Sequence, residues 1–363
     1  MRLPFLTAEL PGIGGVLRAT DDDFVVDEEP AYLPSGTGDH IFVRIEKRGL
    51  TTPSAVTAIA RALRIRDRDI GVAGMKDRHA VTTQWLSLPP PVTPEAGLAL
   101  ALDGIRVLEA VRHPHKLRTG HVRANRFRLR VRGTGPGAAE LARAILERLA
   151  AQPGAPNWFG EQRFGRAGDN AARARELIAR ASQGASGGRR DRRMDRLMLS
   201  ALQSELFNAW LVARLADGLY RSVLVGDIVH KRSGGMFACE DAETDTARLL
   251  AGEIVPTGPM FGEAMRRPTD GTLAAAREDV ILAAANLTRE AFASVRAIAE
   301  GTRRDAAITV ADVAVLAVDH ETTSVAFTLP GGAYATEVMR EVMKHPPTTT
   351  ETEPPAQSHD APD

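Results

Sequence analysis

The stretch that decides the fold runs from residue 71 to residue 88 and reads Gly-Val-Ala-Gly-Met-Lys-Asp-Arg-His-Ala-Val-Thr-Thr-Gln-Trp-Leu-Ser-Leu. Its small residues allow tight turns and close approach of the backbone to a ligand. Asp77 lies between Lys76 and Arg78, and a carboxylate flanked by two cations is expected to be ionised. Residues 81–86 are rich in β-branched and aromatic side chains and predict a strand. Taken alone, the stretch is also compatible with an ordinary surface turn.

The segments before this stretch predict a strand, a helix and then the turn that carries Asp77. Residues 40–45 alternate between apolar and polar side chains, which is typical of a strand. The sequence Thr51-Thr52-Pro53 predicts a helix start, with Thr52 as the N-cap and Pro53 at the first helical position. Functional residues concentrate in connections between such elements, so Asp77 is a candidate functional residue.

Length and composition indicate a two-domain globular protein. The chain has 363 residues, 44% of them hydrophobic and 25% charged, which is typical of soluble proteins and long for a single domain. No window approaches the apolar length of a membrane span, and no signal peptide is evident. A single cysteine, Cys239, excludes an internal disulfide and a multi-cysteine zinc site. We therefore expect a cytoplasmic protein that needs no membrane.

The formal net charge is zero, but basic residues are concentrated in two clusters along the chain. Residues 112–132 contain eight Lys or Arg and no acid, and residues 189–196 contain five Arg against two Asp. Arginine and lysine in such numbers favour contacts with nucleic-acid phosphates. The residues that we expect to make these contacts are Arg112, Lys116, Arg118, Arg189, Arg190, Arg192 and Arg193.

Residues 125–132 alternate strictly and predict a strand with two different faces. Asn125, Phe127, Leu129 and Val131 share one face, and four arginines share the other. An arginine face of this kind is commonly only solvated, and a phenylalanine at such a position is more often part of the core.

No metal or dinucleotide site is predicted. The three aspartates at 21–23 lack the other oxygen ligands of a calcium loop. His113, His115 and His121 lack a ligand spacing, and the glycines near residue 14 do not make a dinucleotide fingerprint. Farther along, residues 197–219 predict a long helix, residues 256–259 (Pro-Thr-Gly-Pro) a loop, and strand character returns near residue 305.

Four segments together resemble the D family of tRNA pseudouridine synthases (the TruD family). They are residues 74–82 (Gly-Met-Lys-Asp-Arg-His-Ala-Val-Thr), Asn125-Arg126-Phe127, residues 156–165 (Pro-Asn-Trp-Phe-Gly-Glu-Gln-Arg-Phe-Gly) and residues 329–336 (Leu-Pro-Gly-Gly-Ala-Tyr-Ala-Thr). The first is similar to the family signature Ala-Gly-x-Lys-Asp-[Arg/Lys]-x-Ala-Val-Thr. The resemblance extends from about residue 14 to residue 343.

The resemblance implies an α+β fold with a discontinuous catalytic domain. Residues 1–156 and 302–345 would form a pseudouridine synthase domain whose mixed, largely antiparallel sheet is flanked by helices. Residues 157–301 would form an inserted, family-specific α/β domain. Residues 346–363, rich in Pro, Thr, Glu and Asp, are expected to form a disordered tail.

The resemblance also implies a function, an isomerase that converts uridine 13 in the D arm of tRNA to pseudouridine without a metal or cofactor. Asp77 would be the catalytic carboxylate, and Phe127, with Asn125 beside it, would contact the target base. Arg18, Lys76 and Arg78 would also be substrate-binding residues, and they are the cations that could pair with Asp77; the sequence does not choose among them. The expected partner is tRNA, with the protein acting as a monomer and needing no protein partner.

Two other functions remain compatible with these residues. The chain could be an RNA-binding protein without isomerase activity, or a carboxylate-dependent hydrolase that acts on nucleotides. The isomerisation itself needs only an ionised carboxylate acting as nucleophile or proton acceptor, and a ring that holds the detached base.

Overall fold

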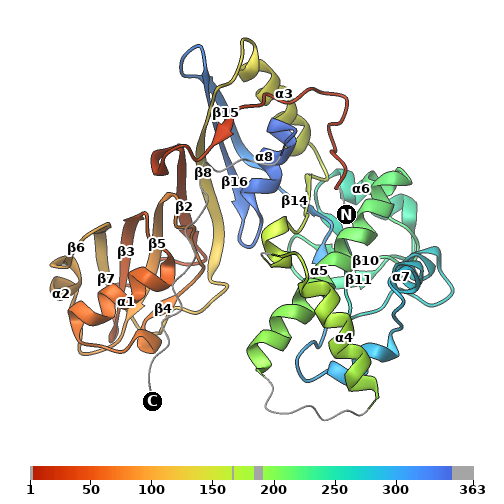
Figure 1. The fold of residues 1–363 in the computed structure, drawn as a ribbon, viewed down its shortest axis with the longest axis horizontal. Helices are drawn as coiled ribbons and strands as arrows, with labels where there is room; N and C mark the ends of the chain where they lie inside the picture. The colour runs from red at the N-terminus through yellow and green to blue at the C-terminus, as the bar shows by residue number, and fades with distance from the viewer. Residues whose placement is uncertain (1–2, 166, 184–190, 346–363) are drawn as a thin grey trace. The chain divides into compact units, whose positions relative to one another are not determined.

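The computed structural model describes residues 3–165, 167–183 and 191–345 (Figure 1). The chain divides into two compact units. One comprises Met1–Gly12, Leu141–Val313 and Phe327–Lys344, and the other includes Ile13–Glu140 and Ala314–Ala326. We call them the helical unit and the sheet unit. None of the helices in the described ranges is long and apolar enough to cross a membrane.

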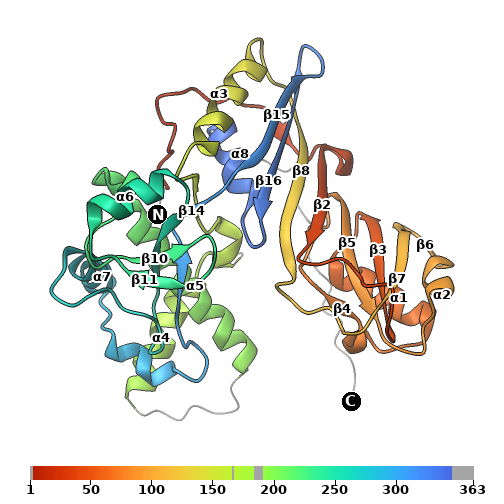
Figure 2. The ribbon, with the colours of Figure 1, turned by 180° about the vertical axis from the view of Figure 1, so that it is seen from behind.

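The sheet unit is built on a mixed sheet whose main strand order is β15-β16-β8-β2-β5-β3-β7-β6, with β1 paired to β8 and β4 paired to β5. Strands β2 and β5 are parallel, and the other registers that define the sheet are antiparallel (Figures 1 and 2). The mixed, largely antiparallel sheet of the expected α+β fold is thus confirmed. The bounds are β1 Val16–Leu17, β2 Phe24–Pro30, β3 His40–Arg48, β4 Gly71–Val72, β5 Val81–Leu88, β6 Ala101–Leu102, β7 Ile105–His113, β8 Val122–Arg132, β15 Ala311–Ala317 and β16 Thr322–Pro330.

The predicted helix after β3 is present, but its N-cap is one residue earlier than expected. Helix α1 (Thr52–Leu63) is capped by the hydroxyl of Thr51, which accepts a hydrogen bond from the Ser54 amide. The Thr52 side chain instead points into the sheet and donates to Gln84. Either threonine could cap the helix by sequence alone, and the tertiary hydrogen bond to Gln84 decides between them. Ala55 and Ile59 of α1 are buried in the apolar core with Ile41, Val43 and Ile45 of β3 and Leu86 and Leu88 of β5.

The C-terminal strand β16 lies next to β8 in the sheet order, although the two strands are separated by about 190 residues of sequence. Within the sheet unit, the Thr134 amide donates to the Glu321 carbonyl and the hydroxyls of Thr134 and Thr323 are 3.0 Å apart. The strand at residues 323–329 therefore belongs to the sheet of Phe127, as expected, whereas residues 302–308 pair in other sheets.

The helical unit combines helices with a four-stranded sheet in the order β11-β10-β12-β13. The sheet is formed by β10 Ile228–Lys231, β11 Met236–Ala238, β12 Ile254–Met260 and β13 Thr302–Asp305. A two-stranded ladder joins β9 Ala155–Pro156 to β14 Ala307–Ile308. The larger helices are α3 Ala138–Ala150, α4 Asn170–Ser182, α5 Arg192–Ala216, α6 Ala242–Leu250, α7 Leu273–Ala284 and α8 Ala335–Met343. The short α2 (Pro94–Leu98) belongs to the sheet unit.

The prediction of a loop at residues 256–259 is wrong, because these residues lie inside the buried strand β12. Pro256 and Pro259 suggested a turn, but pairing with β10 and β13 determines the local structure. Gly258 is needed there because Trp210 and Phe207 lie within 2.7 Å of the position that a Cβ atom would take. Aromatic packing from α5 thus requires the glycine that resembled a turn signal.

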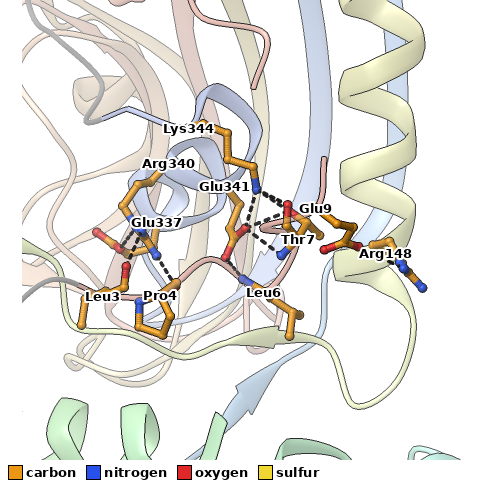
Figure 3. A network of polar contacts seen from close by, with 10 residues as sticks. All are labelled: Leu3, Pro4, Leu6, Thr7, Glu9, Arg148, Glu337, Arg340, Glu341 and Lys344. Carbon is orange, nitrogen blue, oxygen red and sulfur yellow. Dashed lines mark hydrogen bonds and ion pairs between the residues drawn. The ribbon is translucent and has the colours of Figure 1, made fainter. Parts of the chain in front are cut away.

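The start of the chain is fastened to α8 within the helical unit (Figure 3). The buried carboxylate of Glu341 accepts hydrogen bonds from the amides of Leu6 and Thr7 and from the Thr7 hydroxyl. Lys344 donates to the Thr7 carbonyl, and Arg340 donates to the Leu3 carbonyl. The described part of the N-terminal segment has no helix or strand to satisfy its backbone groups, and side chains of α8 make these hydrogen bonds instead.

Candidate functional site

Asp77 and Arg18 form an ion pair at the edge of the sheet unit. Arg18 directly follows β1 and has a positive φ of 64°, which is uncommon outside glycine and marks a strained backbone. The Asp77 side chain is 51% exposed, whereas that of Arg18 is only 9% exposed. The carboxylate is therefore open to a ligand and is held by a cation that is fixed in the protein. Of the three candidate cations, Arg18 pairs with Asp77.

Lys47 holds the backbone of the same turn by hydrogen bonds. This residue of β3 is fully buried, and its ammonium donates to the backbone carbonyls of Asp77, at 2.7 Å, and Leu50. Burial lowers the pKa of Lys47 to about 8, and the nearby charge of Asp77 opposes that shift. Lys47 therefore fixes the backbone of the turn and contributes positive charge near the Asp77 side chain.

Lys76 points away from Asp77 and forms an ion pair with Glu28 of β2. Both side chains are buried, and the second Glu28 oxygen accepts from the Trp85 amide at 3.1 Å. A buried ion pair of this kind costs desolvation and is retained where its geometry is needed. Here it connects the turn to β2 and β5.

Arg78 also does not pair with Asp77, because its guanidinium donates to the Gly49 carbonyl at 3.3 Å. On the other side of Asp77, the Lys76 amide donates to the Thr52 hydroxyl, which in turn donates to Gln84. The residues on both sides of Asp77 thus hold the turn to α1 and β3, while the Asp77 carboxylate projects outward.

Phe127 lies in a row of paired residues that crosses the sheet. It pairs with Val26 of β2, Val26 pairs with Thr82 of β5, and Thr82 pairs with Lys47 of β3. Residues that are directly opposite on neighbouring strands share one face of the sheet. Phe127 and the lysine beneath Asp77 therefore belong to the same face.

A second set of contacts connects Phe127 to the ion pair. The Arg18 guanidinium carbon lies 3.8 Å from the centroid of the Phe24 ring. Phe24 packs edge-to-face on Phe127, with the ring centroids 6.2 Å apart and the planes at 78°. Phe127 is 7% exposed, so it is mainly a core residue in the free protein. Aromatic packing and cation–π contact together position Arg18.

Several buried polar atoms of this region have no hydrogen-bond partner. They are Nε of Arg18, Oγ1 of Thr82, Nε2 of Gln84 and Oδ1 of Asn125. Asn125 pairs with Glu28 across β8 and β2, two residues from Phe127. Unsatisfied buried groups are rare because each costs free energy. Their occurrence around Asp77 is typical of a site prepared for a polar ligand or water.

The described basic residues that we expect to bind phosphate lie in two places. Arg112, Lys116 and Arg118 belong to the sheet unit, where Arg112 donates to the Gly38 carbonyl and Lys116 to the Arg68 carbonyl. Within the ranges that the structure covers, none of the three has a carboxylate partner. Arg192 and Arg193 are exposed in the first turn of α5, where the helix dipole disfavours cations. Arg189 and Arg190 lie outside the described residues.

The arginine face of β8 differs from these clusters because the neighbouring strand supplies acids. Arg126 and Arg123 both pair with Glu29, and Arg128 pairs with Asp27. Arg132 pairs with the buried carboxylate of Asp23. This face is therefore largely neutralised, which agrees with interpreting it as a solvated strand face.

The three histidines belong to an aromatic cluster. Tyr32 stacks on His113 with ring centroids 5.3 Å apart, and its hydroxyl lies 2.8 Å from Nδ1 of His121. Burial lowers the pKa of His113 below its usual value, with His115 and His40 adding to the shift. No group of three metal-ligating side chains occurs in the parts of the chain that are described.

Sequence reasoning missed Lys47, Glu28 and Phe24, which hold the site together. Each looks like a regular strand residue. The sequence did contain a signal for Lys47. Its position continues the alternation of Ile41, Val43 and Ile45, so the side chain is expected on the buried face of the strand. A lysine in a buried register has to find a polar partner, and that partner is the Asp77 turn.

Comparison with known proteins matches most of the chain to one family. The family model for tRNA pseudouridine synthase D (TruD) matches residues 2–187 and 185–342. A tRNA pseudouridine synthase D of Anaeromyxobacter dehalogenans is 52% identical over 94% of this chain and 96% of its own length. One from Thermus thermophilus is 41% identical over 94% of this chain and 92% of its own length.

A solved structure shares the fold. The chain superposes with a TM-score of 0.76 on a Methanosarcina mazei protein described as a candidate tRNA pseudouridine synthase D, at 22% identity. The alignment covers 93% of this chain and 95% of the other. The family model and the relatives together define a pseudouridine synthase, which is an isomerase. The chain belongs to the tRNA pseudouridine synthase D (TruD) family.

Proposed function

We propose that this protein converts uridine 13 in the D arm of tRNA to pseudouridine, with Asp77 as the catalytic carboxylate. The observation that carries the proposal is the Asp77–Arg18 pair, in which an exposed carboxylate is oriented by a buried guanidinium. A charge-assisted pair of this kind fixes the carboxylate while leaving a face of it accessible.

The reaction breaks the N1–C1′ bond of uridine, rotates the base and joins C5 to C1′. The proton on C5 is lost and N1 gains one, so the RNA keeps its composition and no electrons are exchanged. Asp77 acts at the sugar, either by attack on C1′ or by accepting a sugar proton. Either role needs an ionised carboxylate, which Arg18 beside it and Lys47 beneath it favour.

Phe127 and Asn125 are the residues that we assign to the base. The detached base has to remain in place while it turns, and an apolar ring can hold it by stacking without fixing its orientation. Asn125 has an unpartnered carbonyl oxygen that can accept the N3 proton of uracil. A base in folded tRNA has to be extruded before it reaches these residues. Phosphate contacts from Arg112, Lys116, Arg118 and the basic residues near the start of α5 offset that cost.

We also propose that the catalytic domain is discontinuous, comprising residues 1–156 and 302–345 around an insert of residues 157–301. The position of β16 beside β8 supports the joining of the C-terminal strands to the sheet of the site.

Carbodiimide-adduct primer extension on tRNA incubated with the purified protein tests the function. We expect a new stop that maps to position 13 and an unchanged RNA mass. A changed mass would indicate a hydrolase, and tRNA binding without any stop would indicate an RNA-binding protein that lacks the activity. A stop at another uridine would contradict the assigned position but not the chemistry.

A further inference from the structure

Two arginines, Arg163 and Arg304, contact the same aromatic ring in an unusual arrangement. Arg163 lies in the segment Asn157–Gly165, which is not part of the proposed catalytic site. Arg163, in the short helical turn Glu161–Phe164, and Arg304 of β13 both face the ring of Phe159. Their guanidinium carbons lie 5.5 and 3.9 Å from its centroid. All three residues belong to the helical unit, so the arrangement does not depend on the other unit.

Neither arginine has a carboxylate partner in the ranges that the structure describes. Arg163 donates to the hydroxyls of Ser200 and Ser204, and Arg304 donates to the backbone and side-chain oxygens of Asn157. These neutral acceptors hold both guanidiniums in place without neutralising them.

The other buried arginines of the unit show how unusual this is. Arg214 lies 2.7 Å from the Asp227 carboxylate, and Arg303, the neighbour of Arg304, is paired with Glu278. Successive strand residues point to opposite faces, so Glu278 is on the wrong side of β13 to reach Arg304. Asp305 likewise faces away and binds His230.

The electrostatics of the pair favour an added anion. Burial lowers the pKa of Arg304 to about 10, and the positive charge of Arg163 adds to the shift, whereas Tyr334 and Asp305 oppose it. Two cations that face one ring without an ion-pair partner of their own cost free energy that a bound anion would recover. The ring of the partly exposed Tyr334 lies 6.3 Å from that of Phe159, so its hydroxyl is a further donor that can be considered for the same anion.

One acid beside the segment, Glu337, is directed elsewhere. Glu337 lies under Gly160, where a Cβ atom would be 2.6 Å from its oxygen, and it pairs with Arg340. The glycine thus lets the segment pass over α8 while Arg163 remains turned toward Phe159 and α5.

We propose that Arg163 and Arg304, with the Tyr334 hydroxyl, form a binding site for a backbone phosphodiester of the RNA substrate. The site deepens the proposed function, on which it rests for the identity of the RNA. Planar guanidiniums that are already fixed by hydrogen bonds lose little entropy when they bind a phosphate oxygen. The buried ring of Phe159 supplies an apolar surface that both guanidiniums contact.

The test compares full-length Arg163→Gln with wild type and with Arg180→Gln, in which an exposed arginine of the same unit loses its pair with Glu176. The affinity for substrate tRNA is measured from about 50 to 200 mM salt. We expect Arg163→Gln to lower the slope of log affinity against log salt by about 0.9 and to weaken binding roughly tenfold at physiological salt. Single-turnover isomerisation by the Arg180→Gln control at saturating enzyme should stay within about twofold of wild type, since Arg180 lies outside both the catalytic site and the proposed anion site.

Arg163→Lys separates a phosphate contact from a purely structural role. Lysine keeps the charge but not the fork of donors, so the salt slope should remain near wild type. If Arg163→Gln gave the slope and affinity of the Arg180→Gln control, or if Arg163→Lys lowered the slope as much as Gln, the site would be disproved.

A measurement without RNA keeps this inference distinct from the proposed function. Sulfate should raise the melting temperature of wild type more than chloride does at equal ionic strength, and this excess should shrink in Arg163→Gln. An equal excess in both proteins would disprove the site even if tRNA were isomerised. A reduced excess together with no isomerisation of any tRNA would support the anion site and reject the proposed function.

Discussion

The ammonium of Lys47 lies 2.7 Å from the backbone carbonyl oxygen of Asp77, a residue 30 positions later in the chain. A fully buried lysine thus holds the turn from which the exposed carboxylate projects. The main-chain contact explains how the side chain of Asp77 can be open to a substrate and still be positioned: the lysine fixes the backbone and Arg18 fixes the carboxylate.

The buried Lys47 should make stability depend on pH. In the unfolded chain a lysine releases its proton near pH 10.4, whereas burial lowers the pKa of Lys47 to about 8 in the folded protein. Between these values the unfolded chain binds more protons, so the unfolding free energy of the wild type should rise with pH. Relative to Lys47→Met, we expect a gain of about 2 kcal/mol between pH 7 and pH 10. Urea unfolding of both proteins across this range measures it, and a pH-independent difference would show that Lys47 is not desolvated.

Arg18 should act on turnover rather than on folding. Arg18→Met removes the cation that orients Asp77, and we expect single-turnover isomerisation to fall by at least about a hundredfold. Arg18→Lys keeps the charge and should recover part of the rate, although it loses the planar stacking on Phe24. If Arg18→Met kept wild-type turnover, Arg18 would be only a structural partner of Phe24.

Thr82 offers a test of whether the unpartnered polar atoms belong to the site. Its hydroxyl is fully buried without a hydrogen bond, so Thr82→Val should leave stability unchanged or raise it by up to about 1 kcal/mol. Turnover should fall, because the hydroxyl is prepared for a ligand or a water. Thr323→Val is the matched control: its hydroxyl is paired with Thr134, and the substitution should cost about 1 kcal/mol. A Thr82→Val protein with lower stability and full activity would contradict this assignment.

The sequence predicted the strand after Asp77, the placement of Asp77 in a connection and the two faces of residues 125–132. Each of these depends on local periodicity or turn chemistry, which residues adjacent in sequence determine. The cation partner of Asp77 could not be chosen, because Lys76 and Arg78 are closer in sequence and Arg18 is brought in by the pairing of β1 with β8. The buried pair of Lys76 and Glu28 likewise depends on which strands become neighbours. The prediction of a loop at Pro256 to Pro259 was wrong for the same reason, because pairing with its partner strands determines β12.

The fastening of the N-terminal segment to α8 should contribute to the stability of the helical unit. Glu341→Leu removes the acceptor of the Leu6 and Thr7 amides and leaves these donors unpaired beside Lys344 (Figure 3). We expect a loss of about 2 to 3 kcal/mol, seen as a lower melting temperature. The control Glu9→Leu removes only an exposed pair with Arg148 and should change the melting temperature little. Equal effects of the two substitutions would mean that the buried carboxylate is not what holds the segment.

Asp77 itself gives the decisive test of the mechanism. Asn is close to Asp in shape and keeps an acceptor oxygen, but it is uncharged and a poor nucleophile and base. Asp77→Asn should therefore abolish isomerisation while the fold is retained, because the side chain is exposed and contributes little burial. Binding of tRNA should persist or become slightly tighter, since phosphate contacts dominate affinity and one negative charge is removed.

The measurement is single-turnover isomerisation at saturating enzyme, with the melting temperature recorded beside it. Asp69→Asn is the control, because it removes another surface carboxylate, paired with Arg66, outside the site. If Asp77 were only a turn residue, the substitution would lower the melting temperature and leave turnover in place. Activity of Asp77→Asn within about tenfold of wild type at unchanged tRNA binding would remove the carboxylate from the mechanism, since a catalytic nucleophile or base contributes far more than that factor.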